Sequence, residues 1–235
     1  MRQIRKSLFE TNSSSTHAIC IHKNSKPENF QDKYYLYSFE SFCYGRCESE
    51  LIESTIGKIA YAYIVAKDLS KWESNKTGYT INDFLKNLYE VAEEFYVEPE
   101  DKYDKHDILN KENLDELIKQ IDKLEENYDA YVDHTEDFLD NGFYEKLMSD
   151  KDFVKRLIFD TESYITVGGD EYRGYNLKKI GFQDDYDETY NRDYHYQEDE
   201  NGWPLYVDPS EKYIGEFWDK VKELRKEFEI YFKGN

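Results

Sequence analysis

Five adjacent polar residues followed by a histidine form the combination in this sequence that is best suited to chemistry. The stretch reads "FETNSSSTHA", and its candidate ligand-binding residues are Asn12, Ser13, Ser14, Ser15, Thr16 and His17. Hydroxyls and exposed backbone N–H groups can line a concavity that holds a phosphate or another anion, with His17 as acid, base or donor. A serine nucleophile also needs a base and an orienting group, and no residue marks that third member. The sequence therefore assigns no catalytic residue.

The same stretch is also typical of a turn. Asparagine, serine and threonine side chains hydrogen-bond to nearby backbone groups, so a connection between two strands needs nothing further. Both interpretations stay open at this point, and the sequence leans towards a protein that is not an enzyme.

A resemblance extends over residues 4–21, where a basic strand leads into "FETNSSSTHAICI". This pattern resembles the start of a family of uncharacterised proteins from bacteriophages and mobile elements of Gram-positive bacteria. The resemblance implies a phage or prophage accessory protein that acts in the bacterial cytoplasm. No activity is established for that family, so the resemblance assigns no role to any residue.

A second candidate surface lies in a segment rich in acidic residues and tyrosine. Residues 184–200 contain eight acidic residues, one arginine and four tyrosines. Spaced carboxylates reproduce the charge spacing of a nucleic-acid backbone, and tyrosines are anchors that interfaces favour. A solvated loop is the simpler alternative. The partner-binding candidates are Asp184, Asp185, Tyr186, Asp187, Glu188, Tyr190, Tyr194, Tyr196, Glu198, Asp199 and Glu200.

The overall charge limits the class of partner. Fifty-one acidic and 31 basic residues give a net charge of -20. This charge opposes direct binding to nucleic acid, which requires a basic face, and it attracts basic proteins. We therefore predict a phage-encoded acidic protein, a nucleic-acid mimic of the anti-CRISPR kind, that binds and inhibits a basic, nucleic-acid-binding host protein such as a defence effector. The alternative is an enzyme or binding domain for a phosphate-containing or nucleotide-like ligand that uses Asn12 to His17, with Arg2, Arg5 and Lys6 shielding the anion.

A metal site is a weaker hypothesis. Cys20 and His22 alternate along a predicted strand and so share a face, and Cys43 and Cys47 supply two further thiols of the kind zinc prefers. The spacing does not match a standard zinc knuckle, and reduced cysteines explain it equally well. The sequence therefore predicts no metal and no cofactor. An odd number of cysteines and the lack of a long apolar run predict a cytoplasmic protein without a membrane partner, and no pattern specifies an oligomeric state.

The elements around these residues predict an α+β fold with a small antiparallel N-terminal sheet. Strands are expected at 2–9, 18–22 and 34–39, with local connections between them. The sequence "ESYITVGGDEYRGYNLKKIGF" predicts a β-hairpin that turns at Gly168 and Gly169.

About five helices are expected to pack with this sheet. Apolar residues from Leu51 to Leu69 recur at helical spacing, within a helical middle of about 51–160. Capping residues predict further helices that start near Thr80, Asn110 and Ser149, the second extending to Val132. A last helix is expected over 209–232, after the segment 184–206, within a single domain of residues 1–235.

Overall fold

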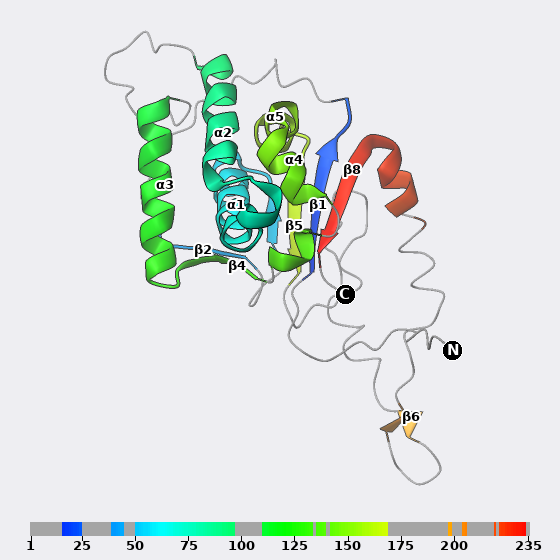
Figure 1. The fold of residues 1–235 in the computed structure, drawn as a ribbon. Helices are drawn as coiled ribbons and strands as arrows, with labels where there is room; N and C mark the ends of the chain where they lie inside the picture. Colours follow the sequence, from blue (N-terminus) through cyan, green and yellow to red (C-terminus); the bar gives the residue numbers. More distant parts are fainter. Residues whose placement is uncertain are drawn as a thin grey trace.

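The computed structural model describes the central part of the chain and its C-terminal strand. The described residues are 16–24, 39–44, 50–96, 110–133, 135–139, 142–168, 197–198, 204–205, 219 and 221–233. They form a mixed α and β structure, which confirms the predicted α+β class (Figure 1).

Four strands form the main sheet in the order β3-β5-β1-β8. They are β1 (Thr16–His22), β3 (Glu50–Ile52), β5 (Tyr164–Gly168) and β8 (Phe228–Lys233). Every neighbouring pair in this sheet is antiparallel. β1 lies between β5 and β8, with Ile19 opposite both Ile165 and Tyr231. The sheet therefore joins segments that are far apart in the sequence.

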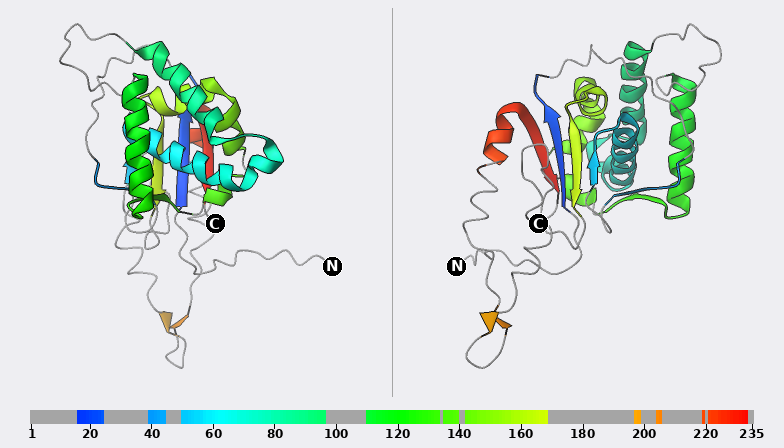
Figure 2. Two further views of the ribbon diagram at one scale, coloured as in Figure 1. Left: turned by 60° about the vertical axis from the view of Figure 1, so that its left-hand side comes forward. Right: turned by 180° about the vertical axis from the view of Figure 1, so that it is seen from behind.

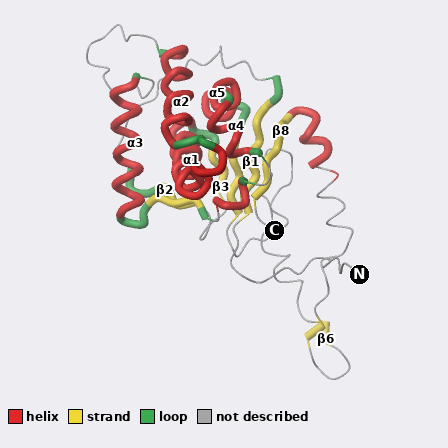
Figure 3. The backbone as a smooth tube through the Cα atoms, viewed as in Figure 1, coloured by secondary structure: helices red, strands yellow, loops and turns green. Residues whose placement is uncertain are grey.

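Five α-helices and one short 3-10 helix lie within residues 55–159 of the described part of the chain. Their bounds are α1 (Thr55–Thr77), α2 (Ile81–Phe95), α3 (Lys111–Glu126), η2 (Thr135–Phe138), α4 (Phe143–Ser149) and α5 (Lys151–Phe159). Residues 221–227 are also helical and run directly into β8 (Figure 3). Two small sheets complete the description: β2 (Phe42–Tyr44) is parallel to β4 (Ala130–Val132), and β6 (Gln197–Glu198) is antiparallel to β7 (Pro204–Leu205).

The two faces of the main sheet pack against different helices (Figure 2). Ile19, Ile165 and Tyr231 belong to a large core that includes the buried residues of α1 to α5. On the opposite face Cys20 and Phe228 pack with apolar side chains of the helical segment 221–227. This arrangement follows from strand geometry, because successive side chains of β1 point to opposite faces.

Local capping signals correctly marked two helix starts. At α2 the backbone N–H of Thr80 donates to Asp83 Oδ2 at 2.7 Å, as a capping box requires. At α3 the side chain of Asn110 accepts from the backbone N–H of Asn113 at 2.8 Å. These contacts satisfy N–H groups that otherwise have no partner in the first turn.

Two predicted helix starts are wrong. Leu51 and Ile52 belong to β3, and α1 begins only after Ser54, whose hydroxyl accepts from the backbone N–H of Gly57. α5 is capped by Asp150, whereas Ser149 ends α4 and donates its hydroxyl to the carbonyl of Glu145. Leu51 and Ile52 pair with β5 although they fit helical spacing. Ser149 is the last residue of the preceding helix α4.

Two predicted helix ends are also wrong, because each helix is followed by a strand. α3 stops at Glu126, since Tyr128 adopts a left-handed backbone with φ of 62° and β4 begins at Ala130. The C-terminal helix gives way at Phe228 to β8, which pairs with β1. Its predicted start at 209 lies outside the described residues.

The predicted strands are recovered only in part. Residues 18–22 lie within β1, but its two neighbours are β5 and β8 instead of locally connected strands. The strand predicted at 2–9 and residues 34–38 fall outside the described residues. β5 contains the first half of the predicted hairpin and pairs with β1 on one edge and β3 on the other. The second half of the hairpin lies outside the described residues.

Candidate functional site

Most of the residues predicted to form sites lie outside the described part of the chain. These residues are Asn12, Ser13, Ser14, Ser15, Cys47 and all partner-binding candidates of the segment 184–200 except Glu198, which belongs to β6. Thr16 is the first residue of β1. The structure therefore places His17, Cys20, His22 and Cys43, and every candidate site stays a prediction.

His17 lies fully buried at the contact between β1 and α1. Its Nδ1 atom is 2.6 Å from the hydroxyl of Tyr61. Burial, together with nearby Tyr44, raises the pKa of Tyr61 well above its ordinary value, so the hydroxyl keeps its proton. The hydroxyl can donate to Nδ1 or accept from it, so the contact allows either ring tautomer. Tyr61 therefore fixes the position of this histidine.

Cys20 and His22 share one face of β1, as the sequence predicts, but they do not meet Cys43. Cys20 is buried in the smaller core, and His22 Nε2 lies 3.3 Å from Glu162 Oε2. Cys43 is exposed on β2, with its Sγ 3.3 Å from the carbonyl oxygen of Asp129. Within the described residues, no group of three or more histidine, cysteine or acidic side chains is placed to hold a metal ion.

A buried lysine that the sequence analysis did not single out joins α1 to the turn before β5. Lys58 is fully buried, and its Nζ donates to the carbonyls of Asp160 at 2.6 Å and Ser163 at 3.0 Å. The Ser163 hydroxyl donates to Asp160 Oδ2 at 2.9 Å and accepts from the backbone N–H of His22 at 3.0 Å. The sequence pattern that could have indicated this buried lysine is its position within an otherwise apolar stretch of α1.

Several carboxylates are held by basic side chains of neighbouring elements. Glu94 of α2 lies 3.0 Å from Lys151 Nζ and 2.8 Å from Lys155 Nζ, and hydrogen bonds from both lysines lower the pKa of its carboxyl group. Lys67 of α1 contacts both Asp122 and Glu125 of α3. These ion pairs join helices to one another.

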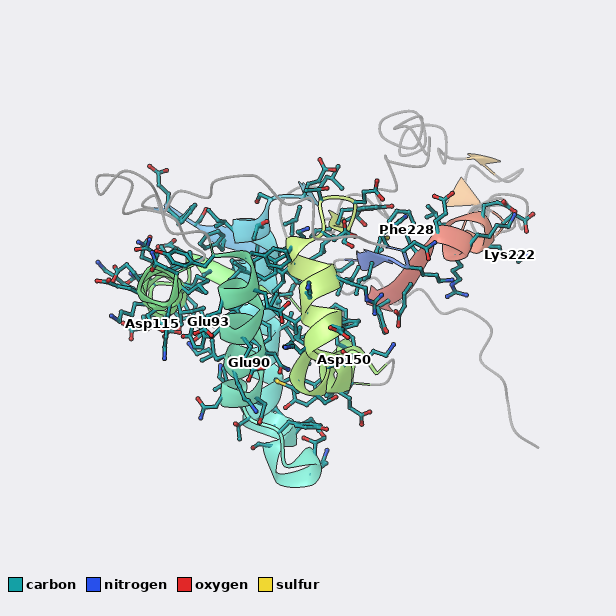
Figure 4. All side chains as sticks on the ribbon, turned by 90° about the horizontal axis from the view of Figure 1, so that it is seen from above. Glu90, Glu93, Asp115, Asp150, Lys222 and Phe228 are labelled. Carbon is teal, nitrogen blue, oxygen red and sulfur yellow. The ribbon has the colours of Figure 1, made fainter. Side chains whose placement is uncertain are left out.

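A different group of carboxylates gathers where the C-terminal end of α2 meets the N-terminal end of α3. We call it the α2–α3 acidic end, and its members are Glu90, Glu93, Glu112, Asp115 and Glu116. Figure 4 shows Glu90 and Glu93 on α2 beside Asp115 on α3. The Tyr89 hydroxyl donates to Asp115 Oδ1 at 2.5 Å, so a tyrosine lies among these carboxylates.

Few strong ion pairs neutralise the α2–α3 acidic end. Lys86 and Lys151 approach Glu90 only to 3.9 and 3.8 Å, and Lys119 approaches Glu116 only to 4.0 Å. Glu93 and Glu112 are exposed and have no ion pair among the described residues. The last turn of α2 contains no basic residue, although the negative end of the helix dipole favours one there. Lys111 of α3 lines the same groove as Glu90 and Glu93 and lies over the ring of Tyr89. The carboxylates of the acidic end are therefore loosely paired with lysines, and Glu93 and Glu112 face solvent.

Comparisons of the chain with protein-family models, with curated proteins and with solved structures gave no match. Among the helices that the structure describes, none combines the length and apolar composition needed to cross a bilayer.

Proposed function

We propose that this protein is an acidic binding protein that engages and inhibits a basic, nucleic-acid-binding partner. The observation that carries the proposal is the α2–α3 acidic end, where the ion pairs of carboxylates from two helices with nearby lysines are no shorter than 3.8 Å. Its charge adds to a net charge of -20 over the whole chain. A surface of this kind attracts a basic cleft and accelerates the encounter.

The helix dipole supports a functional origin for this charge. Carboxylates near the C-terminal end of a helix are each disfavoured by about 0.3 to 1 kcal/mol at low salt. Glu93 incurs this cost without a compensating ion pair among the described residues. Selection for stability alone favours a neutral or basic residue at such a position, so partner binding is the better explanation.

The context of the proposal comes from the N-terminal resemblance. A phage accessory protein acting in the bacterial cytoplasm meets host nucleases and other defence effectors, which bind nucleic acid through basic clefts. The segment 184–200, of which only residues 197–198 are described, carries further carboxylates and tyrosines in the sequence, and we predict that they contact the same partner. Competition with nucleic acid for the partner's cleft is then the mechanism of inhibition.

Capture from a bacterial lysate tests the proposal. The immobilised full chain is expected to retain a basic, nucleic-acid-binding protein that elutes as salt rises and that nucleic acid displaces. Replacing Glu90, Glu93 and Glu112 by lysine is expected to weaken capture at least tenfold. The matched control replaces Asp219, Glu223 and Glu227, which are exposed acidic residues near the C-terminus, by lysine. Equal losses of capture in both variants assign the effect to net charge alone. If the full chain captures no protein at any salt concentration, the proposal is contradicted.

The second candidate, a binding domain for a phosphate-containing or nucleotide-like ligand at Asn12 to His17, has one observation in its favour. The hydroxyl of Tyr61 lies 2.6 Å from Nδ1 of His17 and fixes the position of the imidazole ring directly after the polar run. Complete burial of His17 is the observation against it. Replacing Ser14 by alanine and His17 by glutamine is expected to abolish nucleotide binding with the fold intact if this candidate is right. Replacing Asp185, Asp187 and Glu188 by lysine then has no such effect.

A further inference from the structure

A groove of about 510 Å³ runs along α2 and reaches the first residue of α3. Its volume is within the range of sites that bind small molecules. Lys111 lines the groove from α3. The lining residues of α2 recur at helical spacing and so form one stripe of that helix: Asn82, Leu85, Lys86, Tyr89, Glu90 and Glu93. The groove therefore includes two members of the α2–α3 acidic end.

A positively charged side chain of the protein itself already occupies the aromatic part of this groove. The Nζ atom of Lys111 lies 5.5 Å from the centroid of the Tyr89 ring, a distance at which an aromatic face attracts a cation. The ring is held in place because the Tyr89 hydroxyl donates to Asp115 Oδ1 at 2.5 Å. Lys111 thus shows which chemistry the ring accepts.

Lys111 is a weakly held occupant of the ring. It is the first residue of α3, where the positive end of the helix dipole disfavours a cation. Its side chain is exposed, and an ammonium group is strongly hydrated, so moving it into solvent costs little. A guanidinium group is planar, is more weakly hydrated and stacks on aromatic rings. An arginine side chain therefore competes well for the same place.

Carboxylates beside the ring add hydrogen-bond acceptors for such a group. Glu93 follows Tyr89 by one helical turn and is exposed. Lys86 and Lys151 approach Glu90 only to 3.9 and 3.8 Å, which is too long for a hydrogen bond. The fork of a guanidinium group matches a carboxylate with two parallel hydrogen bonds. Exchange of Lys111 for an arginine also leaves the number of positive charges in the groove unchanged.

We propose that this groove binds an arginine side chain of the basic partner, which displaces Lys111 from the Tyr89 ring and pairs with Glu90 or Glu93. This inference deepens the proposed function and rests on it. The net charge attracts the partner over a distance, and the Tyr89 ring selects arginine over lysine at the point of contact.

Two peptides of equal charge that differ only at the centre test this inference. Binding of acetyl-KKRKK-amide and acetyl-KKKKK-amide to the full chain is measured by calorimetry at low salt. The arginine peptide is expected to bind about threefold more tightly, because the guanidinium group stacks on the ring and loses less hydration. Tyr89→Leu removes the aromatic face and is expected to reduce the ratio of the two dissociation constants to about one.

Tyr79→Leu is the matched control, since Tyr79 is also a half-buried tyrosine packed against the larger core. It is expected to keep the threefold ratio. A ratio that persists in Tyr89→Leu overturns the inference.

The displacement of Lys111 has a test of its own at an exposed position, where a substitution leaves the fold intact. Lys111→Gln removes the competing cation and is expected to tighten binding of the arginine peptide at least twofold more than Lys119→Gln does. Lys119 is the control because it is an exposed lysine of the same helix. Equal gains in the two variants mean that charge alone acts, and they overturn the inference even if Tyr89→Leu does not fold.

The outcomes separate the groove from the proposed function. Equal, salt-sensitive binding of both peptides overturns the arginine site and supports the charge-based function. A preference for arginine that Tyr89→Leu removes, without capture of a basic protein from lysate, supports the site and contradicts the proposed function. If neither peptide binds, both are overturned.

Discussion

Two sets of carboxylates on the same helices differ in what they do for the fold. Glu94 and Asp122 face lysines of neighbouring helices at 3.0 Å or less. Glu93, adjacent to Glu94 in the sequence, and Glu112 face solvent without an ion pair among the described residues. Glu93 and Glu94 have the same side chain and lie on the same helix. They differ because packing brings lysines of α5 within reach of Glu94 only.

This comparison shows how structural and functional charge can be separated in a strongly acidic protein. An ion pair between elements fixes their relative position, and removing one partner leaves the other charge partly buried. An exposed carboxylate contributes little to stability and is free to meet a partner. Substitutions should therefore change stability at the first set and binding at the second.

The largest effect on stability is expected at Lys58, a fully buried lysine that joins elements of the fold as the paired carboxylates do. Lys58→Met keeps the length of the side chain and leaves the carbonyls of Asp160 and Ser163 without that donor. We expect a loss of about 3 kcal/mol in the free energy of unfolding, measured with urea. Lys76→Met, at an exposed position, is expected to cost less than about 0.5 kcal/mol. Equal free energies of unfolding for the two variants would mean that the hydrogen bonds of Lys58 do not stabilise the fold.

A smaller effect is expected at Glu229 of β8, which faces Lys146 of α4 and Arg156 of α5. Burial raises the pKa of its carboxyl group, but hydrogen bonds from Lys146 and Tyr231 and the two positive charges outweigh burial and lower it overall. Glu229→Gln is expected to lose about 1 to 2 kcal/mol at neutral pH.

The pH dependence of that loss follows from the sign of the shift. A lowered pKa means that Glu229 stabilises the fold above the ordinary glutamate pKa of 4.5, and that this contribution disappears as pH falls through the lower folded-state value. The stability difference between the native chain and Glu229→Gln should therefore shrink below pH 4.5. Exposed Glu223→Gln is the control and should show no comparable difference. A gap that persists at lower pH contradicts the ion-pair explanation.

An effect of about 1 kcal/mol is expected at Asp122, which accepts from the Tyr63 hydroxyl at 2.8 Å and pairs with Lys67. Burial, and then the hydrogen bond to Asp122, raise the pKa of Tyr63. Asp122→Asn keeps an oxygen that can accept from Tyr63 but removes the charge that pairs with Lys67, and urea unfolding should show the loss. Exposed Asp129→Asn is the control. An unchanged free energy of unfolding would mean that the ion pair of Asp122 does not stabilise the fold.

The smallest effects are expected at the α2–α3 acidic end, where their signs are informative. Glu93→Gln removes a negative charge near the negative end of the α2 dipole and should stabilise the fold by about 0.3 kcal/mol at low salt. Glu112→Gln removes one from the first turn of α3 and should destabilise it by a similar amount. High salt should reduce both changes. If Glu93→Gln instead lowers the free energy of unfolding by more than about 1 kcal/mol, Glu93 belongs with the carboxylates that stabilise the fold.

Features set by neighbouring residues were predictable from sequence. Thr80 and Asn110 were recognised as helix caps because a cap depends on residues within one turn. The buried stretch of α1 was predictable because its apolar residues recur at helical spacing.

Features set by distant residues were not predictable. Leu51 and Ile52 fit helical spacing and strand alternation equally well, and only pairing with β5 selects the strand. Phe228 to Lys233 continue a helix in the sequence, but the open edge of β1 takes them as β8. The role of His17 likewise depends on Tyr61, which lies 44 positions away.

The sequence by itself determined the net negative charge, which is a sum over residues, and the mixed α and β class, which follows from local patterns of capping and apolar spacing. Only the tertiary structure decided which carboxylates hold helices together, which face solvent, and that His17 is enclosed. The reason is physical: an ion pair or a buried hydrogen bond depends on atoms within about 3 to 4 Å, and the packing of distant segments sets those distances.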